Sequence, residues 1–366
     1  MRIRDQFSEL SKQQLIDAFK AVGLKGYSKL TKAALAERLE EYVLSEEFMT
    51  AKLVFLSDNE YGIINDIITG DKTHTASEVM SVESFLTSGY IGVDDKGNLI
   101  LNDGVEELLN KCLTDNVKQT RSLYGVIRMY CNAFVRLYGI IPIQKAHSIY
   151  ADQNVNHLPL DAFVKTVDAI AAVTDEFKIY NACIVNNIYI SFDDSGEIKE
   201  EQPEFNSLLL KQDGCAYFIP DRESLIKFGD SLYFEHTESY TNLAEYLIWL
   251  MERTENNKDM AMPVLEALYT AMESAQTLNE VITVPEISYI ELQNPEEANK
   301  LITLIKALDK DVRKHIYRGF SANILSNYVS AEKNARKREF FESKRNSSRK
   351  SVSLARKKRN KKKKKK

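Results

Sequence analysis

Apolar residues recur at helical spacing in two short segments near the start of the chain. Ser11 and Gln14 have the spacing of a capping box at the start of a first helix, and Gly23 offers that helix a C-terminal stop. Thr31 can cap a second helix. Residues 1–48 are therefore predicted to form a helix, an extended loop and a helix. The apolar positions are Leu15, Phe19 and Val22 in the first helix and Leu35, Leu39 and Val43 in the second.

Helical spacing gives way to alternation twice in the middle of the chain. Residues 50–118 predict two helices followed by a hairpin over Asp95–Asn98, which is the element order of a winged helix. Residues 120–200 repeat this order, so we interpret the two segments as two winged-helix-like units. The second unit has predicted helices over 142–152 and 159–173 and a predicted hairpin over 177–192 that turns at Asn186–Asn187.

The last part of the chain predicts a helical domain and a tail. An unpatterned charged segment over 195–204 marks a boundary, after which amphipathic patterns predict a helical bundle in residues 205–330. Residues 331–366 contain too little apolar area to fold alone and are predicted to be a disordered basic tail. The expected fold is mainly α with a minor α+β part. The bundle helices are predicted over 242–253, 262–274 and 295–308.

The charge of the chain changes sign along its length. The 366 residues carry 49 Lys and Arg against 53 Asp and Glu, which gives a net charge of −4. Residues 1–45 sum to +2, residues 46–330 to −21 and residues 331–366 to +15. A surface as acidic as the central part repels a phosphate backbone. We therefore expect nucleic-acid contacts at the two ends and a protein partner for the acidic middle.

Composition and motifs favour a cytoplasmic protein without enzyme chemistry. The four cysteines lie too far apart for a zinc knuckle and indicate no disulfide framework. Charges interrupt every long apolar stretch, so neither a secretory signal nor a membrane span is expected. No glycine is followed by lysine, which excludes a Walker-type ATPase loop, and the five histidines have no metal or triad spacing. We expect no metal and no cofactor; an enzyme whose site leaves no sequence signature is the remaining alternative.

Two explanations are open for the aromatic residues of the C-terminal third. Aromatic side chains can provide stacking platforms for bases, and at helical spacing they also form hydrophobic cores. We favour the core. The residues concerned are Tyr217, Phe218, Tyr233, Phe234, Tyr240, Tyr246 and Trp249.

The segment over residues 10–45 resembles the N-terminal domain of the Rho termination factor, a SAP-like helix-extended-helix module. The resemblance implies binding to RNA or DNA and a link to transcription termination. Because the chain has no ATPase loop and no OB-barrel pattern after residue 50, only the binding module is implied. The resemblance rests on Leu15, Gly23, Leu24, the run Lys25-Gly26-Tyr27-Ser28-Lys29-Leu30, Lys32, Leu35 and Leu39.

The residue types of this loop suit contacts with a nucleic-acid backbone. Lysines neutralise phosphates, a glycine permits close approach, hydroxyl groups donate hydrogen bonds and a tyrosine ring can stack on a base. Free N–H groups at the start of the second helix attract a phosphate. The alternative is a solvated lysine loop on a module that docks protein. The candidate nucleic-acid-binding residues are Lys12, Lys25, Gly26, Tyr27, Ser28, Lys29, Thr31 and Lys32, with Arg356, Lys357, Lys358 and Arg359 in the tail.

A second resemblance covers residues 120–325. This part is similar to uncharacterised bacterial proteins, mostly Gram-positive, that join such a module to a helical region and often end in a zinc-binding SEC-C knuckle. No cysteine follows Cys215, so the knuckle and its zinc are absent from this sequence. The segments that carry the resemblance are 130–139, 217–225 and 318–320.

The basic tail has three interpretations. It can contact nucleic-acid backbone, contact the acidic middle of its own chain, or be a lysine homopolymer without function. The leading hypothesis is a non-enzymatic, cytoplasmic nucleic-acid-binding protein that contacts RNA or DNA backbone through its N-terminal module and tail. The alternative is a protein-interaction adaptor or scaffold with an acidic docking body.

Overall fold

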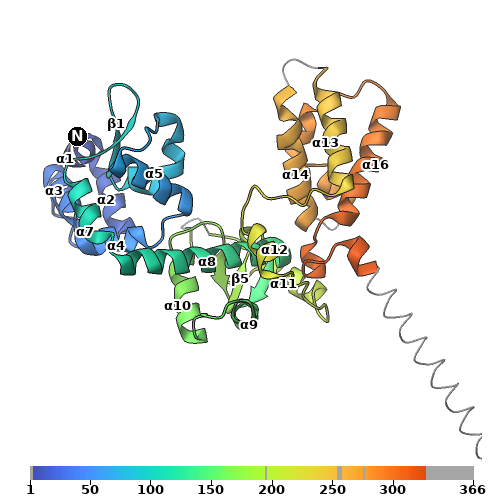
Figure 1. The fold of residues 1–366 in the computed structure, drawn as a ribbon, viewed down its shortest axis with the longest axis horizontal. Coiled ribbons are helices and arrows are strands. Elements are labelled where there is room, and N and C mark those ends of the chain that lie inside the picture. Colours follow the sequence, from blue (N-terminus) through green and yellow to red (C-terminus); the bar gives the residue numbers. More distant parts are fainter. Residues whose placement is uncertain (1–2, 194–195, 254–257, 275–276, 327–366) are drawn as a thin grey trace, which may run out of the picture. The chain divides into compact units, whose positions relative to one another are not determined.

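The computed structural model describes residues 3–193, 196–253, 258–274 and 277–326, and this part of the chain is mainly helical, as the sequence predicts (Figure 1). It divides into two compact units. Unit 1 comprises residues 3–131 and 157–175, and unit 2 comprises the other described residues from 132 onward. The predicted tail, with its candidate residues Arg356, Lys357, Lys358 and Arg359, lies outside the described residues.

Unit 1 consists of helices with one β-hairpin. The long helix α8 begins in unit 1 and ends in unit 2. The elements are α1 (Ile3–Glu9), α2 (Lys12–Ala21), α3 (Lys32–Val43), α4 (Glu46–Leu53), α5 (Asp58–Thr69), the 3₁₀ helix η1 (Ala76–Val82), α6 (Glu83–Thr87), β1 (Ile91–Val93), β2 (Leu99–Leu101), α7 (Val105–Cys112), α8 (Asp115–Tyr138) and α10 (Leu160–Ala171).

The first three helices share one hydrophobic core with the elements that follow them. Buried side chains form a continuous cluster that extends from Ile3 to Val117. The Tyr90 hydroxyl, which follows α6, donates a hydrogen bond to the carbonyl of Val43 at the end of α3. The core therefore crosses the boundary predicted at residues 48–50. It includes the predicted apolar positions Leu15, Phe19, Leu35, Leu39 and Val43.

The hairpin predicted over residues 95–98 is present as β1 and β2, paired antiparallel. Asp94 fixes its turn, because Oδ1 accepts hydrogen bonds from the backbone N–H groups of Lys96 at 2.9 Å and Asn98 at 2.7 Å. These bonds stabilise the carboxylate and lower the pKa of Asp94, and the bond from Asn98 has the larger effect. Helices precede this hairpin in the predicted order. The winged-helix interpretation itself remains a prediction.

A buried histidine joins α5 to η1. His74 Nε2 lies 2.9 Å from Asp66 Oδ2, and Nδ1 lies 3.0 Å from Glu78 Oε1. A carboxylate only accepts hydrogen bonds, so both ring nitrogens carry protons and the imidazole is cationic. The bonds to Glu78 and then Asp66 raise the pKa of His74. The two elements are thus held together by a charged side chain that is almost fully buried.

Unit 2 contains a small sheet and a helical bundle. The sheet order is β3-β5-β4, with both pairings antiparallel. Besides the end of α8, the elements are β3 (Ile140–Pro142), α9 (Ile143–Gln153), β4 (Lys178–Tyr180), β5 (Cys183–Val185), η2 (Asn187–Tyr189), α11 (Pro203–Lys211), α12 (Arg222–Lys227), α13 (Glu238–Met251), η3 (Lys258–Met260), α14 (Ala261–Ser274), α15 (Leu278–Val281), η4 (Pro285–Tyr289), α16 (Pro295–Asp311) and η5 (His315–Tyr317).

The hairpin predicted over 177–192 is present only in part, and its predicted turn is wrong. The chain turns at Asn181 and Ala182, whose φ angles are +48° and +56°. The Asn186 N–H instead donates to the carbonyl of Gly139 at 2.8 Å, which extends the pairing of β5 with β3. The Asn186 side chain then caps η2. Pairing with a strand more than forty residues away, which local patterns do not reveal, sets this register.

The predicted C-terminal bundle is confirmed by α13, α14 and α16, which pack on one another. The predicted helices over 242–253, 262–274 and 295–308 correspond to these three elements. Their apolar faces form a buried cluster between Phe234 and Val312. Phe234, Tyr240 and Tyr246 lie in this cluster, so the core explanation is confirmed for these three residues. It is wrong for Trp249, which is 48% exposed.

A buried polar cluster connects η5 with α8 and α11. His315 Nε2 lies 2.9 Å from the Arg136 carbonyl and therefore donates to it, so Nδ1, 2.7 Å from the Tyr189 hydroxyl, accepts. Burial lowers the pKa of His315 to about 4, and the ring is neutral. Gln212 Nε2 donates to the carbonyls of Tyr138 and His315, each at 2.7 Å. These bonds fix the end of the described chain to the rest of unit 2.

Residues from all three segments that carry the second resemblance meet in unit 2. The Tyr138 hydroxyl donates to the Phe218 carbonyl at 2.7 Å, and the Phe218 N–H donates to the Arg318 carbonyl at 2.9 Å. Gly319 lies so close to Tyr138 that a Cβ atom would be 3.0 Å from its ring. Packing in the fold therefore accounts for these residues.

Candidate nucleic-acid interface

The candidate loop begins where α2 ends in a Schellman motif. The Gly23 N–H donates to the Lys20 carbonyl at 3.0 Å, and the Leu24 N–H donates to the Phe19 carbonyl at 2.9 Å. Gly23 adopts the left-handed conformation that this motif requires, with φ +69°. The predicted C-terminal stop is therefore confirmed, and it turns the chain away from the helix axis.

Both predicted N-caps are present. The Ser11 hydroxyl accepts from the Gln14 N–H at 3.2 Å, and Gln14 Oε1 accepts from the Ser11 N–H at 2.8 Å, which completes the capping box. Thr31 Oγ1 accepts from the Ala34 N–H at 3.2 Å. Lys32 is the first residue of α3, and the N–H groups of a first turn have no acceptor within their own helix. Lys32 therefore lies at the N-terminal end of a helix, where the helix dipole also favours an anion.

The structure brings five of the predicted residues together on the exposed loop and at the first residue of α3. Lys25, Lys29 and Lys32 are exposed, and none forms an ion pair with any residue in the described ranges. Ser28 is exposed between them. Gly26 has φ +82°, a conformation that side chains other than glycine rarely adopt. The three ammonium groups are available to an external anion.

One further cation lies beside this loop and was missed from the sequence. Arg38 is exposed, and its Nη1 is 3.6 Å from the place where a Cβ atom on Gly26 would stand. Arg38 follows Thr31 by seven residues, and this spacing places it two turns along the same face of α3. This helical spacing is the sequence feature from which Arg38 could have been predicted to lie beside the loop.

Lys12 is not part of this group. It is the first residue of α2, whereas the loop follows the last turn of the same helix. Ten helical residues rise about 15 Å, so the Lys12 backbone lies a helix length from the loop. Lys12 is exposed, but it contributes to the interface only for a ligand that follows α2.

Tyr27 has a structural role in the loop. Its ring packs edge-on against Phe19, with 6.2 Å between the ring centroids and 66° between the planes. The side chain is half-buried against the core of unit 1. Only part of the ring is open to a base, so Tyr27 is a smaller stacking platform than its sequence position indicates.

The carboxylates of α3 are partly neutralised from α1. Arg4 donates to Glu37 at 2.9 Å and to Glu40 at 2.8 Å. These ion pairs are solvent-exposed and contribute little to stability. They compensate negative charge on α3, the helix that follows the lysine loop.

Among the described residues, no group of three or more His, Cys, Asp and Glu side chains is placed to hold a metal ion. No helix in the same ranges is long and apolar enough to cross a membrane. Comparison of the chain with protein-family models, with curated proteins and with solved structures finds no match.

Proposed function

We propose that this chain is a non-enzymatic nucleic-acid-binding protein whose loop between α2 and α3 contacts the phosphate backbone of RNA or DNA. The observation that carries the proposal is the group of Lys25, Lys29 and Lys32, exposed and unpaired among the described residues. They lie in a chain whose residues 46–330 have a net charge of −21. These lysines form no ion pair in the described ranges although the chain has an excess of carboxylates. Their ammonium groups therefore favour a polyanionic ligand.

Backbone contacts of this kind give a sequence-tolerant, salt-sensitive affinity. Each phosphate neutralised on a single strand contributes about −0.7 to the slope of log K against log salt concentration. Three lysines therefore contribute about −2 to that slope. Arg38 lies close enough to Gly26 to add a fourth contact.

The proposal includes a cytoplasmic location and a role in transcription termination. None of the four cysteines, Cys112, Cys131, Cys183 and Cys215, is joined in a disulfide, which supports a reducing, cytoplasmic location. A role connected with transcription termination follows from the resemblance of residues 10–45 to the Rho N-terminal domain. The basic tail is a second proposed contact, whose contribution is separable by truncation after Ser330.

Fluorescence anisotropy with labelled single-stranded RNA and duplex DNA, at two salt concentrations, tests the proposal. The proteins are the full chain, the chain ending at Ser330, and both with Lys25→Gln, Lys29→Gln and Lys32→Gln. The matched control is Lys227→Gln, Lys306→Gln and Lys310→Gln. These three lysines are also exposed and unpaired within the described ranges, so the change in net charge is the same.

The loop variant of the chain ending at Ser330 is expected to bind more weakly, with a salt slope shallower by about 2 on single strands. The control variant is expected to keep the parent slope. If the chain ending at Ser330 binds neither probe at low salt, the loop does not bind nucleic acid and the adaptor alternative is favoured. Equal losses in loop and control variants would assign binding to net charge alone and overturn the proposal.

A further inference from the structure

The bundle of unit 2 presents a half-exposed tryptophan in a fixed orientation. Trp249 lies on α13 and is 48% exposed. The Tyr246 ring, one turn earlier, stacks on the indole with 5.4 Å between centroids and 16° between planes. The Arg253 guanidinium, one turn later, lies 4.5 Å from the indole centroid. Lys300 in turn lies 4.3 Å from the centre of the Tyr246 ring. The indole is therefore contacted by Tyr246 on its N-terminal side and by Arg253 on its C-terminal side.

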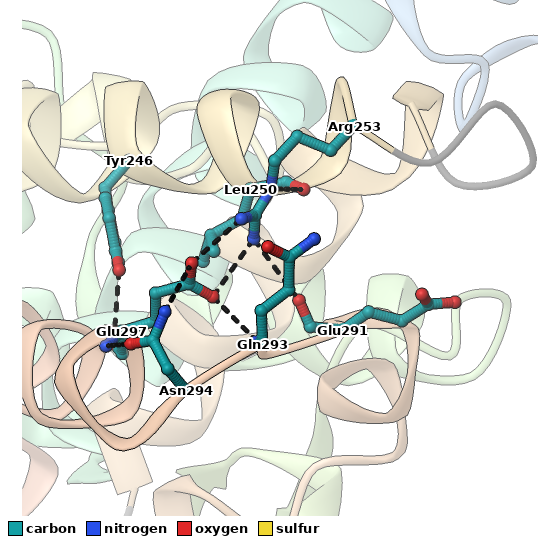
Figure 2. Close-up of polar contacts among 7 residues, drawn as sticks. All are labelled: Tyr246, Leu250, Arg253, Glu291, Gln293, Asn294 and Glu297. Atoms are coloured by element: carbon teal, nitrogen blue, oxygen red, sulfur yellow. Dashed lines mark hydrogen bonds and ion pairs between the residues drawn. The ribbon is translucent and has the colours of Figure 1, made fainter.

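The residues that flank the indole are themselves held by hydrogen bonds (Figure 2). Arg253 donates to both carboxylate oxygens of Glu297, at 2.8 and 3.1 Å. The Tyr246 hydroxyl donates to the Glu297 carbonyl at 3.2 Å. Glu297 Oε2 also accepts from the Gln293 N–H at 2.8 Å, and the Asn294 side chain caps α16. Bidentate pairing of this kind restricts the arginine to one geometry.

Two exposed aliphatic residues neighbour this arrangement along the chain. Ile248, the preceding residue, is 40% exposed. Leu292 is 41% exposed, and it follows Glu291, whose carbonyl accepts from Arg253 at 3.4 Å. We call Ile248, Trp249 and Leu292 the Trp249 patch. A rigid tryptophan with tyrosine and arginine beside it is the composition of binding hot spots, so this surface has the composition of an interface.

The charges around the Trp249 patch are mainly acidic. The nearby cations are already engaged, Arg253 with Glu297 and Lys300 with the Tyr246 ring. The exposed carboxylates on α13 and α16 and in the segments next to these helices have no ion-pair partner in the part of the chain that the structure describes. A ligand that is both apolar and cationic suits such a surface. These carboxylates belong to Glu245, Glu252, Glu291 and Glu296.

The chain itself contains a segment with the complementary chemistry. Residues 331–366 hold 18 basic and 3 acidic residues and two aromatic residues, Phe340 and Phe341. The phenylalanine pair is preceded by Arg336-Lys337-Arg338 and followed by Lys344-Arg345. An apolar pair between basic clusters matches an apolar patch among carboxylates.

The length of chain is sufficient for this segment to reach the patch. Asn323 Nδ2 donates to Asp311 Oδ1 at 2.6 Å, so the end of the described chain lies at the C-terminal end of α16. From Glu297, beside the patch, to Asp311 the helix rises about 21 Å. The stretch from Ser326 to Phe340 spans up to about 46 Å when extended. A single chain can therefore place Phe340 on its own bundle.

We infer that residues 336–345 dock on the Trp249 patch of the same chain, with the phenylalanine pair on the indole edge and the basic clusters opposite the surrounding carboxylates. When this segment is docked, a nucleic acid must compete with the bundle for the same basic residues. The inference does not depend on the lysine loop, because the contact is made without nucleic acid. It gives the tail a folded partner within the molecule.

Acrylamide quenching of intrinsic tryptophan fluorescence tests the contact directly, because Trp249 is the only tryptophan in the chain. The full chain is compared, without nucleic acid, with the chain ending at Ser330. The quenching constant of the full chain is expected to be about twofold lower, since a docked segment excludes water and quencher from the indole. Phe340→Ala with Phe341→Ala in the full chain is expected to restore the value of the shorter chain.

Two controls test whether the protection of Trp249 from quenching depends on the phenylalanine pair and on the Trp249 patch. Replacing Arg356, Lys357, Lys358 and Arg359 by glutamine in the full chain keeps the phenylalanine pair and is expected to leave quenching unchanged. Leu292→Ser in the full chain is expected to raise quenching, and in the chain ending at Ser330 to change it much less. Identical quenching of the full and shortened chains overturns the inference. Protection that appears only as protein concentration rises assigns the patch to a second copy and overturns docking within one chain.

Discussion

Gly139 occupies a position that a larger residue cannot fill without moving its neighbours. Its φ is +68°, and an added Cβ atom would lie 2.7 Å from Tyr189 Cε2, 2.9 Å from Leu208 Cδ2 and 3.1 Å from His315 Cγ. We predict that Gly139→Ala lowers the free energy of unfolding by about 3 kcal/mol, because overpacking adds to the cost of a left-handed alanine. Urea denaturation followed by circular dichroism measures this loss.

Gly214 provides the matched control in the same unit. Its φ is +72°, but no atom lies within 4 Å of the place where its Cβ atom would stand. Gly214→Ala therefore carries the backbone cost alone, about 1 kcal/mol. Equal losses at the two positions would show that the close contacts around Gly139 relax and that crowding is not what requires glycine there.

At the scale of single residues, the sequence reveals what is decided locally. Ser11, Gly23 and Thr31 have their predicted capping roles because each bonds within four residues of itself. The burial of Tyr27 was not predictable, because it depends on the packing of its loop against Phe19. Arg38 was missed because its neighbour in space, Gly26, is twelve residues away in the chain.

The β4–β5 hairpin shows how an element can override the preferences of its turn. Both turn residues have positive φ, which Asn tolerates and Ala does not. We predict that Ala182→Gly stabilises the chain by about 1 kcal/mol, because glycine adopts this conformation without a Cβ clash and Asn-Gly is the preferred two-residue turn. The shift in the midpoint of urea denaturation measures the gain.

Ala216→Gly is the comparison for this hairpin variant. Ala216 is exposed in the same unit and is not among the residues with positive φ. Glycine there only adds entropy to the unfolded chain and is expected to destabilise by a few tenths of a kcal/mol to 1 kcal/mol. If Ala182→Gly also destabilised, the turn geometry described above would be contradicted.

Most helices were predictable because their apolar periodicity is a property of the segment itself. The bundle helices α13, α14 and α16 and the helices α9 and α10 lie within a few residues of their predicted ranges. The β5 register was not predictable, because it depends on Ile140 and Ile141, which come from a strand far along the chain. Sheet pairing over long separations leaves no local pattern.

The two units should respond to pH in opposite directions. His74 in unit 1 has a raised pKa, so its stabilisation is complete below about pH 6.5, the unfolded value, and is lost as pH rises through the folded pKa. His315 in unit 2 has a folded pKa of about 4. Below about pH 6.5 the unfolded chain takes up a proton that folded His315 does not, so stability is lost as pH falls towards 4.

Amide protection factors measured by hydrogen exchange between about pH 5 and pH 8 resolve the two units. Protection of residues 76–82 is expected to fall towards the basic end, and His74→Gln is expected to remove that dependence. Protection of residues 315–317 is expected to fall towards the acidic end, with His315→Gln removing it. A common pH dependence in both segments would contradict the assignment of a charged His74 and a neutral His315.

The division into units was the least predictable feature of the whole molecule. The sequence suggests consecutive domains over 1–48, 50–118, 120–200, 205–330 and 331–366. Residues 120–200 are instead shared between the two units, because 157–175 belong to unit 1 and 132–156 to unit 2. Composition changes mark where a chain alters its chemistry, and the units depend on which distant segments pack together. The candidate loop was predictable because it lies within one short segment.

This interleaving has a consequence for how the protein is made. A ribosome emits the chain from its N-terminus, and domains generally fold as they emerge. Unit 1 cannot be completed until residue 175 has left the exit tunnel, although most of its residues appear long before. Residues 132–156 emerge earlier than 157–175, yet they must await the part of unit 2 that begins at 176. The nascent chain therefore carries an unfinished core of each unit at the same time, and synthesis and folding cannot proceed one domain after another.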